Sequence, residues 1–143
     1  MSGITRAAGY GRTKGYALSA ADELCVIVQL ETEEGLRNLD AIAAVPGVDA
    51  VFIGPSDLAA SMGHLGDAGH PDVQAAVDGA FARLAELGVP AGYLTLRLDE
   101  ARERAAQHDI AFIGVASDTS IVQLGVDTLL ERLGVALREG TAS

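Results

Sequence analysis

Residues 24–57 read LCVIVQLETEEGLRNLDAIAAVPGVDAVFIGPSD, and this stretch decides the fold class of the chain. Two short apolar runs, at 24–30 and 48–54, flank a stretch with helical spacing over about 33–44, for which Thr32 is a candidate N-cap. Because both runs are continuously apolar and do not alternate with polar residues, we expect parallel strands with both faces covered by protein. The segment predicts a strand–helix–strand unit of an α/β protein.

The same pattern continues through the rest of the chain. Further apolar runs lie at 89–95 and 110–116, and helices are predicted over about 71–87, 99–108 and 119–138. Asp99 and Asp118 are candidate N-caps of the last two helices. Residues 1–23 lack periodicity apart from a helical turn near 16–23, so we expect an irregular N-terminal loop segment followed by one domain over 24–143.

Four strand–helix units are compatible with two architectures. The chain has 143 residues, and a (β/α)8 TIM barrel typically has about 250, so half of such a barrel is one candidate. A small doubly wound open sheet is the other. Both place functional residues at the carboxyl ends of the strands, where the search for a site begins.

Composition excludes several partners. Twenty acidic and ten basic residues give a net charge of -10, which would repel nucleic acid and anionic membranes. The single cysteine, Cys25, allows no internal disulfide, and we expect it to pack inertly at the start of the first strand. Neither a membrane span nor the apolar part of a signal peptide is present, so we expect a soluble cytoplasmic protein.

The basic residues are nine arginines and one lysine, Lys14, which lies in the irregular N-terminal segment. A Schiff-base enzyme needs a lysine in a partly desolvated site, and a GxxxxGK[ST] phosphate loop needs one after its glycines. Both chemistries are therefore disfavoured.

Two carboxylates follow neighbouring predicted strands: Glu31 follows the first and Asp57 follows the second. Strands lie about 4.8 Å apart, so both side chains can reach one site. Oxygen ligands suit Mg²⁺ or Mn²⁺ better than zinc. The alternative is that Glu31 is a first-turn helix acid and Asp57 caps a turn. Likewise, the N–H groups of Ser56 and Asp57 either face an anion after Gly54-Pro55 or form an ordinary tight turn.

Other candidates have a structural alternative as well. The connection over 60–71 is long and contains His64 and His70, each a possible ligand or base, although a histidine before Pro71 is more often a helix cap. His108 is expected to pair with a helix C-terminus. Arg6 and Arg12 are candidate anion contacts in the N-terminal segment, although solvated arginines are commoner.

Four stretches taken together resemble the HpcH/HpaI family of class II pyruvate aldolases, which includes 4-hydroxy-2-oxoheptanedioate and 2-dehydro-3-deoxyglucarate aldolases. They are VQLET (28–32), GVDAVFIGPSDLAASMG (47–63), HPDVQAAV (70–77) and VASDTSI (115–121), and RAAGYGR (6–12) also matches. The resemblance implies the second half of a (β/α)8 barrel, strands five to eight.

By this resemblance, Glu31 and Asp57 bind a divalent metal (Mg²⁺, Mn²⁺ or Co²⁺) and Gln29 borders bound pyruvate. The amides of Ser56 and Asp57 would hold the pyruvate carboxylate, and Leu94 would line the aldehyde pocket. The implied reaction is reversible cleavage of a 4-hydroxy-2-oxo acid into pyruvate and an aldehyde through a metal-stabilised enolate.

The chain departs from the family pattern in one respect. The family's catalytic histidine and its keto-contacting arginine belong to the first half of the barrel, and neither His64 nor His70 matches the histidine motif. Three explanations of the missing first half are open: a truncated gene, association of two half-barrels, and a partner chain that supplies the other half.

We expect a homo-oligomer or complementation by another half-barrel, because edge strands and an apolar sheet face need cover. The alternatives are a fragment that binds metal and pyruvate without turnover, and a non-catalytic open-sheet regulatory domain.

Overall fold

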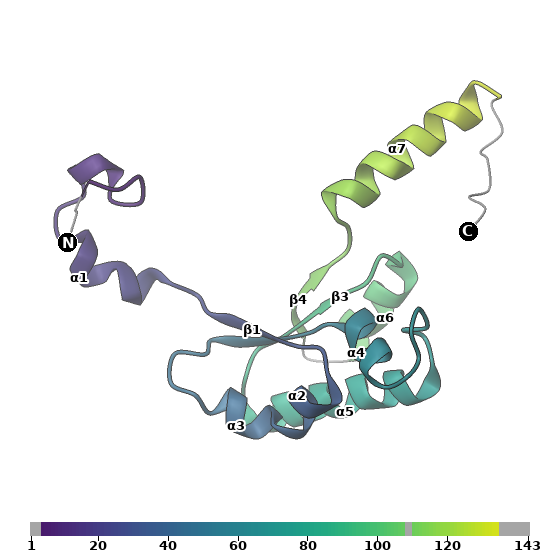
Figure 1. Cartoon of the computed structure of the whole chain (residues 1–143), viewed down its shortest axis with the longest axis horizontal. Helices are drawn as coiled ribbons and strands as arrows, with labels where there is room; N and C mark the ends of the chain where they lie inside the picture. Colours follow the sequence, from purple (N-terminus) through teal and green to yellow (C-terminus); the bar gives the residue numbers. More distant parts are fainter. Residues whose placement is uncertain (1–3, 108–109, 135–143) are drawn as a thin grey trace.

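The structure is a computed structural model that describes residues 4–107 and 110–134. Its centre is a parallel sheet with the strand order β1-β2-β3-β4, formed by β1 (Ile27–Leu30), β2 (Ala50–Ile53), β3 (Ala91–Leu94) and β4 (Ile110–Gly114). At least one helix follows every strand (Figure 1). The predicted α/β class with four strand–helix units is confirmed.

Short helices precede the sheet, and longer ones follow its strands. The former are η1 (Gly9–Gly11), α1 (Tyr16–Ser19) and η2 (Ala20–Glu23), and the latter are α2 (Glu33–Arg37), α3 (Leu39–Ala43), α4 (Pro55–Ser61), α5 (Pro71–Leu87), α6 (Leu98–Gln107) and α7 (Asp118–Arg132). The helical turn predicted near 16–23 is present as α1 and η2.

Strand order decides between the two candidate architectures. In a doubly wound sheet the order reverses at a switch point, and helices cover both faces. Here each strand pairs with the next one along the chain, and α2, α3 and α5 lie together on one side of the sheet (Figure 1). Consecutive parallel pairing with helices outside is the arrangement of a (β/α)8 barrel, so the open-sheet alternative is disfavoured.

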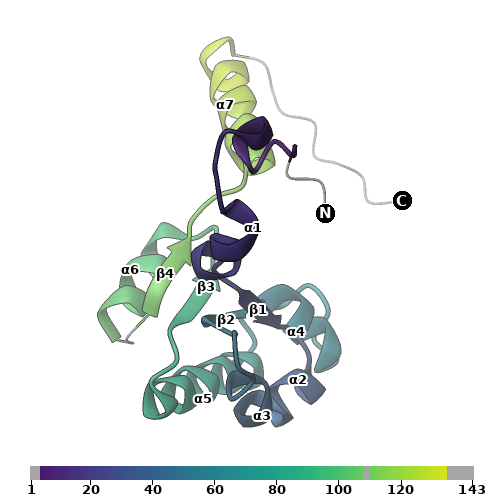
Figure 2. The same ribbon diagram turned by 90° about the vertical axis from the view of Figure 1, so that its left-hand side faces the viewer.

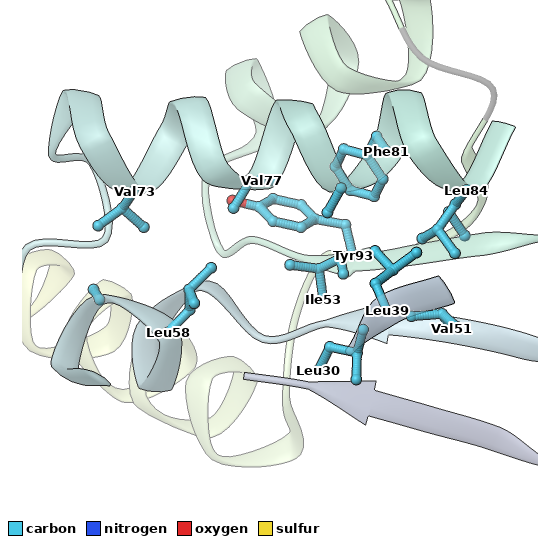
Figure 3. Packing of buried hydrophobic residues seen from close by; sticks show 13 residues of the cluster. Leu30, Leu39, Val51, Ile53, Leu58, Val73, Val77, Phe81, Leu84 and Tyr93 are labelled. Atoms are coloured by element: carbon cyan, nitrogen blue, oxygen red, sulfur yellow. The ribbon is translucent and has the colours of Figure 1, made fainter. Parts of the chain in front are cut away.

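The core lies between this face of the sheet and α5 (Figure 3). Apolar residues at helical spacing on α5 point toward the strands, and the buried ones are Val73, Val77, Ala80, Phe81 and Leu84. From the sheet, Val51, Ile53 and Tyr93 meet them, each at most 1% exposed. The helix predicted over about 71–87 is confirmed; Leu87, in its last turn, is 39% exposed.

The opposite face of the sheet is not covered by the described residues, contrary to the prediction that both faces are. The strand register aligns Gln29, Phe52, Gly92 and Phe112 in one row on this face. The rings of Phe52 and Phe112 stack with centroids 5.9 Å apart, and the Phe112 ring lies over Gly92, where a Cβ would stand 2.1 Å from it. In a closed barrel this face would be the interior.

Helix α7 also differs from its prediction. The predicted range is about 119–138, of which 135–138 lie outside the described residues; the helix ends at Arg132, and none of its residues is buried. Figure 2 shows it extending away from the sheet, as the N-terminal segment does. Its exposed apolar side chains are Ile121, Val122, Leu124, Val126 and Leu129.

Local sequence signals place some helix ends correctly and others wrongly. Thr32 caps α2 by accepting from the Gly35 N–H, as predicted. The helix expected over 33–44 is divided at Asn38, and the whole of α4 was missed. Its Pro55 was expected in a turn, but proline is equally favourable at the first helical position.

Two predicted N-caps are wrong. Asp99 lies inside the first turn of α6, where its carboxylate accepts a hydrogen bond from Arg97 at 2.9 Å. Asp118 is the first residue of α7, which Ser117 caps through a reciprocal pair with Ser120. An acidic residue is favourable in the first turn as well as at the cap, so composition alone does not separate the two positions.

Cys25 is exposed, so the expectation that it packs inertly is wrong. It lies two residues before the start of β1. Among the described residues, no helix combines the length and the apolar character needed to cross a bilayer.

Candidate active site

Gln29, Glu31 and Gly54 lie together where β1 and β2 end. The Gln29 Nε2 donates to Glu31 Oε2 at 2.7 Å, and the Gly54 N–H donates to the Leu30 carbonyl at 3.0 Å. A Cβ at position 54 would stand 2.7 Å from Gln29 Nε2 and 3.2 Å from Glu31 Oε2. An added Cβ would therefore displace the end of the Gln29 side chain, whose amide holds the half-buried Glu31 carboxylate in one orientation.

Ser56 and Asp57 occupy the first turn of α4, directly after Gly54, and both are exposed. The first N–H groups of a helix lack intrahelical acceptors, and they carry partial positive charge. The GPSD segment is therefore the start of a helix and not the turn that was predicted, and its first N–H groups make no intrahelical hydrogen bond. Glu31 and Asp57 follow neighbouring strands at the same rim of the sheet.

A cavity of about 450 Å³ opens beside this rim. Ser56 and Leu94 both border it, and Gln29, Glu31 and Asp57 do not. Its polar lining includes Gln74 of α5, Thr95 and Arg97 of the connection after β3, and Glu100 and Glu103 of α6. The predicted site residues thus fall into two adjacent groups, one around Gly54 and one around the cavity.

A buried polar cluster behind the cavity was not predicted. Arg104 is 6% exposed and forms hydrogen bonds with Asp78 and Gln74, and its Nε lies 3.6 Å from Glu100 Oε1. Its guanidinium also lies 5.0 Å from the centre of the Tyr93 ring. The signal in the sequence is the acid–base pair four residues apart in the helix predicted over 99–108, but such pairs are usually solvated.

Glu100 connects this cluster to the cavity wall. It accepts from the Tyr93 hydroxyl at 2.9 Å and from the Thr95 hydroxyl at 2.8 Å. Burial, followed by the hydrogen bond to Glu100, raises the pKa of Tyr93 to about 12. Tyr93 is therefore a neutral hydrogen-bond donor at physiological pH, and the cluster holds the carboxyl end of β3 in place.

The remaining candidates are dispersed. His70 caps α5 by accepting from the Asp72 N–H at 3.2 Å, as the structural alternative predicted. His64 stacks on His70, with ring centroids 3.5 Å apart. Arg6 and Arg12 are exposed in the N-terminal segment, and His108 lies outside the described residues.

The fold and the strand-end residues define an α/β chain of the (β/α)8 type with a polar site at the carboxyl rim of its sheet. The HpcH/HpaI aldolase/citrate lyase family model matches residues 3–130. The chain belongs to this family.

Individual relatives support the same family. The chain is 47% identical to a pyruvate aldolase of Rhizobium etli over 92% of this chain and 52% of the relative. It is 38% identical to a 4-hydroxy-2-oxo-heptane-1,7-dioate aldolase of Shigella sonnei over 93% of this chain and 50% of the relative. A solved structure of an HpcH/HpaI aldolase/citrate lyase family protein from Burkholderia cenocepacia superposes with a TM-score of 0.86 at 36% identity, over 94% of this chain and 52% of that one. The chain spans about half the length of these relatives.

Proposed function

We propose that this chain carries the metal- and pyruvate-binding residues of an aldolase that reversibly cleaves 4-hydroxy-2-oxo acids into pyruvate and an aldehyde. The observation that carries the proposal is the packing of Gln29 and Glu31 over Gly54, directly before Ser56 and Asp57. Lyase chemistry on a small 2-oxo acid agrees with the names of the relatives.

The donor set fits a divalent cation. Glu31 and Asp57 offer carboxylate oxygens from neighbouring strand ends, and hard oxygen ligands suit Mg²⁺ or Mn²⁺, with Co²⁺ also accommodated. Gln29 donates to one Glu31 oxygen and leaves the other free to bind an ion. When bound, the metal supplies Lewis acidity toward a carbonyl oxygen.

The other residues bind and orient the substrate. The free N–H groups of Ser56 and Asp57 at the start of α4 hold the carboxylate of pyruvate, where the helix dipole favours negative charge. Leu94, 38% exposed, contacts the aldehyde part of the substrate. Ser56 and Leu94 border the same cavity, which supports a carboxylate end and an aldehyde end of one ligand.

A coupled assay of pyruvate release tests the proposal. With Mg²⁺, Mn²⁺ or Co²⁺, Glu31→Ala and Asp57→Ala should abolish pyruvate formation. Glu33→Ala and Glu34→Ala, which remove exposed acids from α2, are the matched controls and should leave it unchanged. Pyruvate formation that survives both site substitutions would refute the assignment.

A second candidate is a fragment that binds metal and pyruvate without turnover. It is favoured by the fact that the chain spans about half the length of its relatives. Paramagnetic relaxation of water by Mn²⁺ separates the two candidates: a fragment would show Mn²⁺ binding that Glu31→Ala removes, and no pyruvate release.

We also propose that the uncovered sheet face and α7 associate with a second copy or with another half-barrel. The apolar side chains exposed on α7, such as Leu129 at 60%, would be buried by such contact. A monodisperse monomer in light scattering would contradict this. A cytoplasmic location stays a prediction.

A further inference from the structure

Three side chains that the proposed reaction does not use meet between α4 and α5. His64 lies in the connection, His70 is the N-cap of α5, and Asp72 lies in its first turn. The Asp72 Oδ2 is 3.8 Å from His64 Nε2 and 3.8 Å from His70 Nδ1. One potential ligand atom from each residue lies within 4.8 Å of the other two.

These distances are too long for hydrogen bonds. Within the part of the chain that the structure describes, no hydrogen bond to the His64 ring is found, although this side chain is only 27% exposed. Around a tetrahedral Zn²⁺ with bonds near 2.0–2.1 Å, ligand atoms lie about 3.4 Å apart. The gap between Asp72 and each histidine is therefore close to the width that one ion would span.

The connecting backbone is held in place without an ion. The His64 N–H donates to the Ala59 carbonyl at 2.7 Å, the Asp67 N–H to the His64 carbonyl at 2.9 Å, and the His70 N–H to the Asp67 carbonyl at 3.1 Å. A site on a constrained backbone costs little entropy to order when it binds a ligand. The three side chains are thus presented by a turn and a helix start whose positions are already set.

Two adjustments accompany binding. The imidazole planes are stacked at 15°, so their lone pairs run nearly side by side, and one ring must turn about the soft torsion next to it. The His70 Nδ1 also accepts the Asp72 N–H at 3.2 Å, and a metal at this nitrogen would replace that cap. Both changes are confined to side chains.

We propose that His64, His70 and Asp72 bind one divalent transition-metal ion of the Zn²⁺ class. Two imidazole nitrogens and a carboxylate oxygen suit Zn²⁺, Co²⁺ or Ni²⁺, whereas Mg²⁺ prefers an all-oxygen set. The site shares no residue with Glu31 and Asp57. Ala68 and Gly69, in the same connection, line the cavity, so the ion would fix one wall of it.

The test is a Zn²⁺ titration of the whole chain in competition with a chromophoric chelator. All variants carry Cys25→Ser, because the exposed thiol would itself bind Zn²⁺. The chain in which His64, His70 and Asp72 are intact should bind one equivalent of Zn²⁺ at this site. Loss of an outer-shell partner alone lowers metal affinity about 10- to 100-fold, so His64→Ala should weaken binding by at least about 100-fold.

Further variants make the result specific. His70→Asn removes an imidazole but keeps a good cap and should weaken binding equally. Asp67 is a carboxylate of the same connection that lies outside the cluster, so Asp67→Asn should leave the Zn²⁺ affinity unchanged. Glu31→Ala/Asp57→Ala should also retain Zn²⁺, which keeps this test independent of the proposed aldolase site.

Circular dichroism verifies folding, and His64→Gln replaces His64→Ala if the latter unfolds. Visible absorption of Co²⁺ bound to the Glu31→Ala/Asp57→Ala variant provides a second readout of nitrogen and oxygen ligation, free of Co²⁺ bound at the proposed aldolase site. Zn²⁺ affinity that is unchanged in His64→Ala, or an absence of stoichiometric binding by the whole chain, would overturn the proposal.

Discussion

Helices α5 and α7 both carry apolar residues at helical spacing, but only α5 buries them. Five residues of α5 are buried against the sheet, whereas none of α7 is buried. Leu84 on α5 is completely buried, and Leu129 on α7 is 60% exposed. The comparison shows that helical spacing of apolar residues predicts a helix and the face that seeks cover, but not which surface provides it.

The two sides of the sheet differ in the same way. On the α5 side, Ile53 and Tyr93 are at most 1% exposed and complete a continuous core. On the other side, the rings of Phe52 and Phe112 stack on each other, and the Phe112 ring lies over Gly92. Stability of the described chain therefore comes mainly from one layer, since burial of apolar area is the dominant favourable contribution.

The largest expected difference between the two helices comes from the same substitution in each. Leu84→Ala should lower the free energy of unfolding by about 2–5 kcal/mol because it opens a cavity in the core. At concentrations where the chain is monomeric, Leu129→Ala should change it by at most about 0.5 kcal/mol. Urea unfolding measures both, and equal losses would mean that α7 is covered in solution.

Arg104→Met probes the polar part of the packed layer. Removal of the guanidinium takes away the cation beside Glu100 and the donor to the Gln74 side-chain oxygen, and the unfolding free energy should fall by about 2–3 kcal/mol. Arg83→Met, which breaks the exposed pair with Asp40, is the matched control and should cost much less. Similar losses in urea unfolding would indicate that the Arg104 cluster is solvated.

A glycine pair compares the uncovered sheet face with an open helix surface. At Gly92 an added Cβ would meet the Phe112 ring at 2.1 Å, so Gly92→Ala should displace the ring and cost about 1–2 kcal/mol. At Gly79 on α5 nothing lies within 4 Å, and Gly79→Ala should stabilise by up to about 1 kcal/mol. In thermal unfolding, Gly92→Ala should lower the melting temperature and Gly79→Ala should raise it. An unchanged melting temperature in Gly92→Ala would mean that the aromatic stack is not formed.

Ser117→Ala should affect α7 alone. It removes the cap that accepts the Ser120 N–H at 3.1 Å and should cost the helix about 1 kcal/mol. Hydrogen exchange should become faster in α7 and stay unchanged in α5. Faster exchange throughout the chain would show that α7 unfolds together with the core.

The smallest effect at neutral pH belongs to Tyr93. Its pKa is about 12 in the folded chain against an ordinary 10.0, so the unfolded chain loses this proton first. Stability should therefore be unaffected below pH 10 and fall as the pH rises from 10 to 12. Ultraviolet titration of a Tyr10→Phe/Tyr16→Phe variant measures Tyr93 alone, and ionisation near pH 10 would show that its burial is incomplete.

The sequence predicted most reliably those features that short motifs specify. Family membership was predictable from motifs such as VQLET and GPSD, whose residues Gln29, Glu31 and Gly54 lie in contact where β1 and β2 end. The roles of Glu31 and Asp57 remain a proposal. The His64 and His70 pair with Asp72, and the Arg104 cluster, were not predictable, because each joins residues whose facing depends on how helices and connections pack.

The sequence by itself determined the four strand–helix units, the cap at Thr32 and the family, since local spacing and short motifs specify them. Only the tertiary structure decided the consecutive strand order, the burial of Arg104 and the exposure of α7. The physical reason is that the spacing of apolar residues shows which face of a helix or strand must be buried. Which other part of the protein buries that face depends on how the elements pack together.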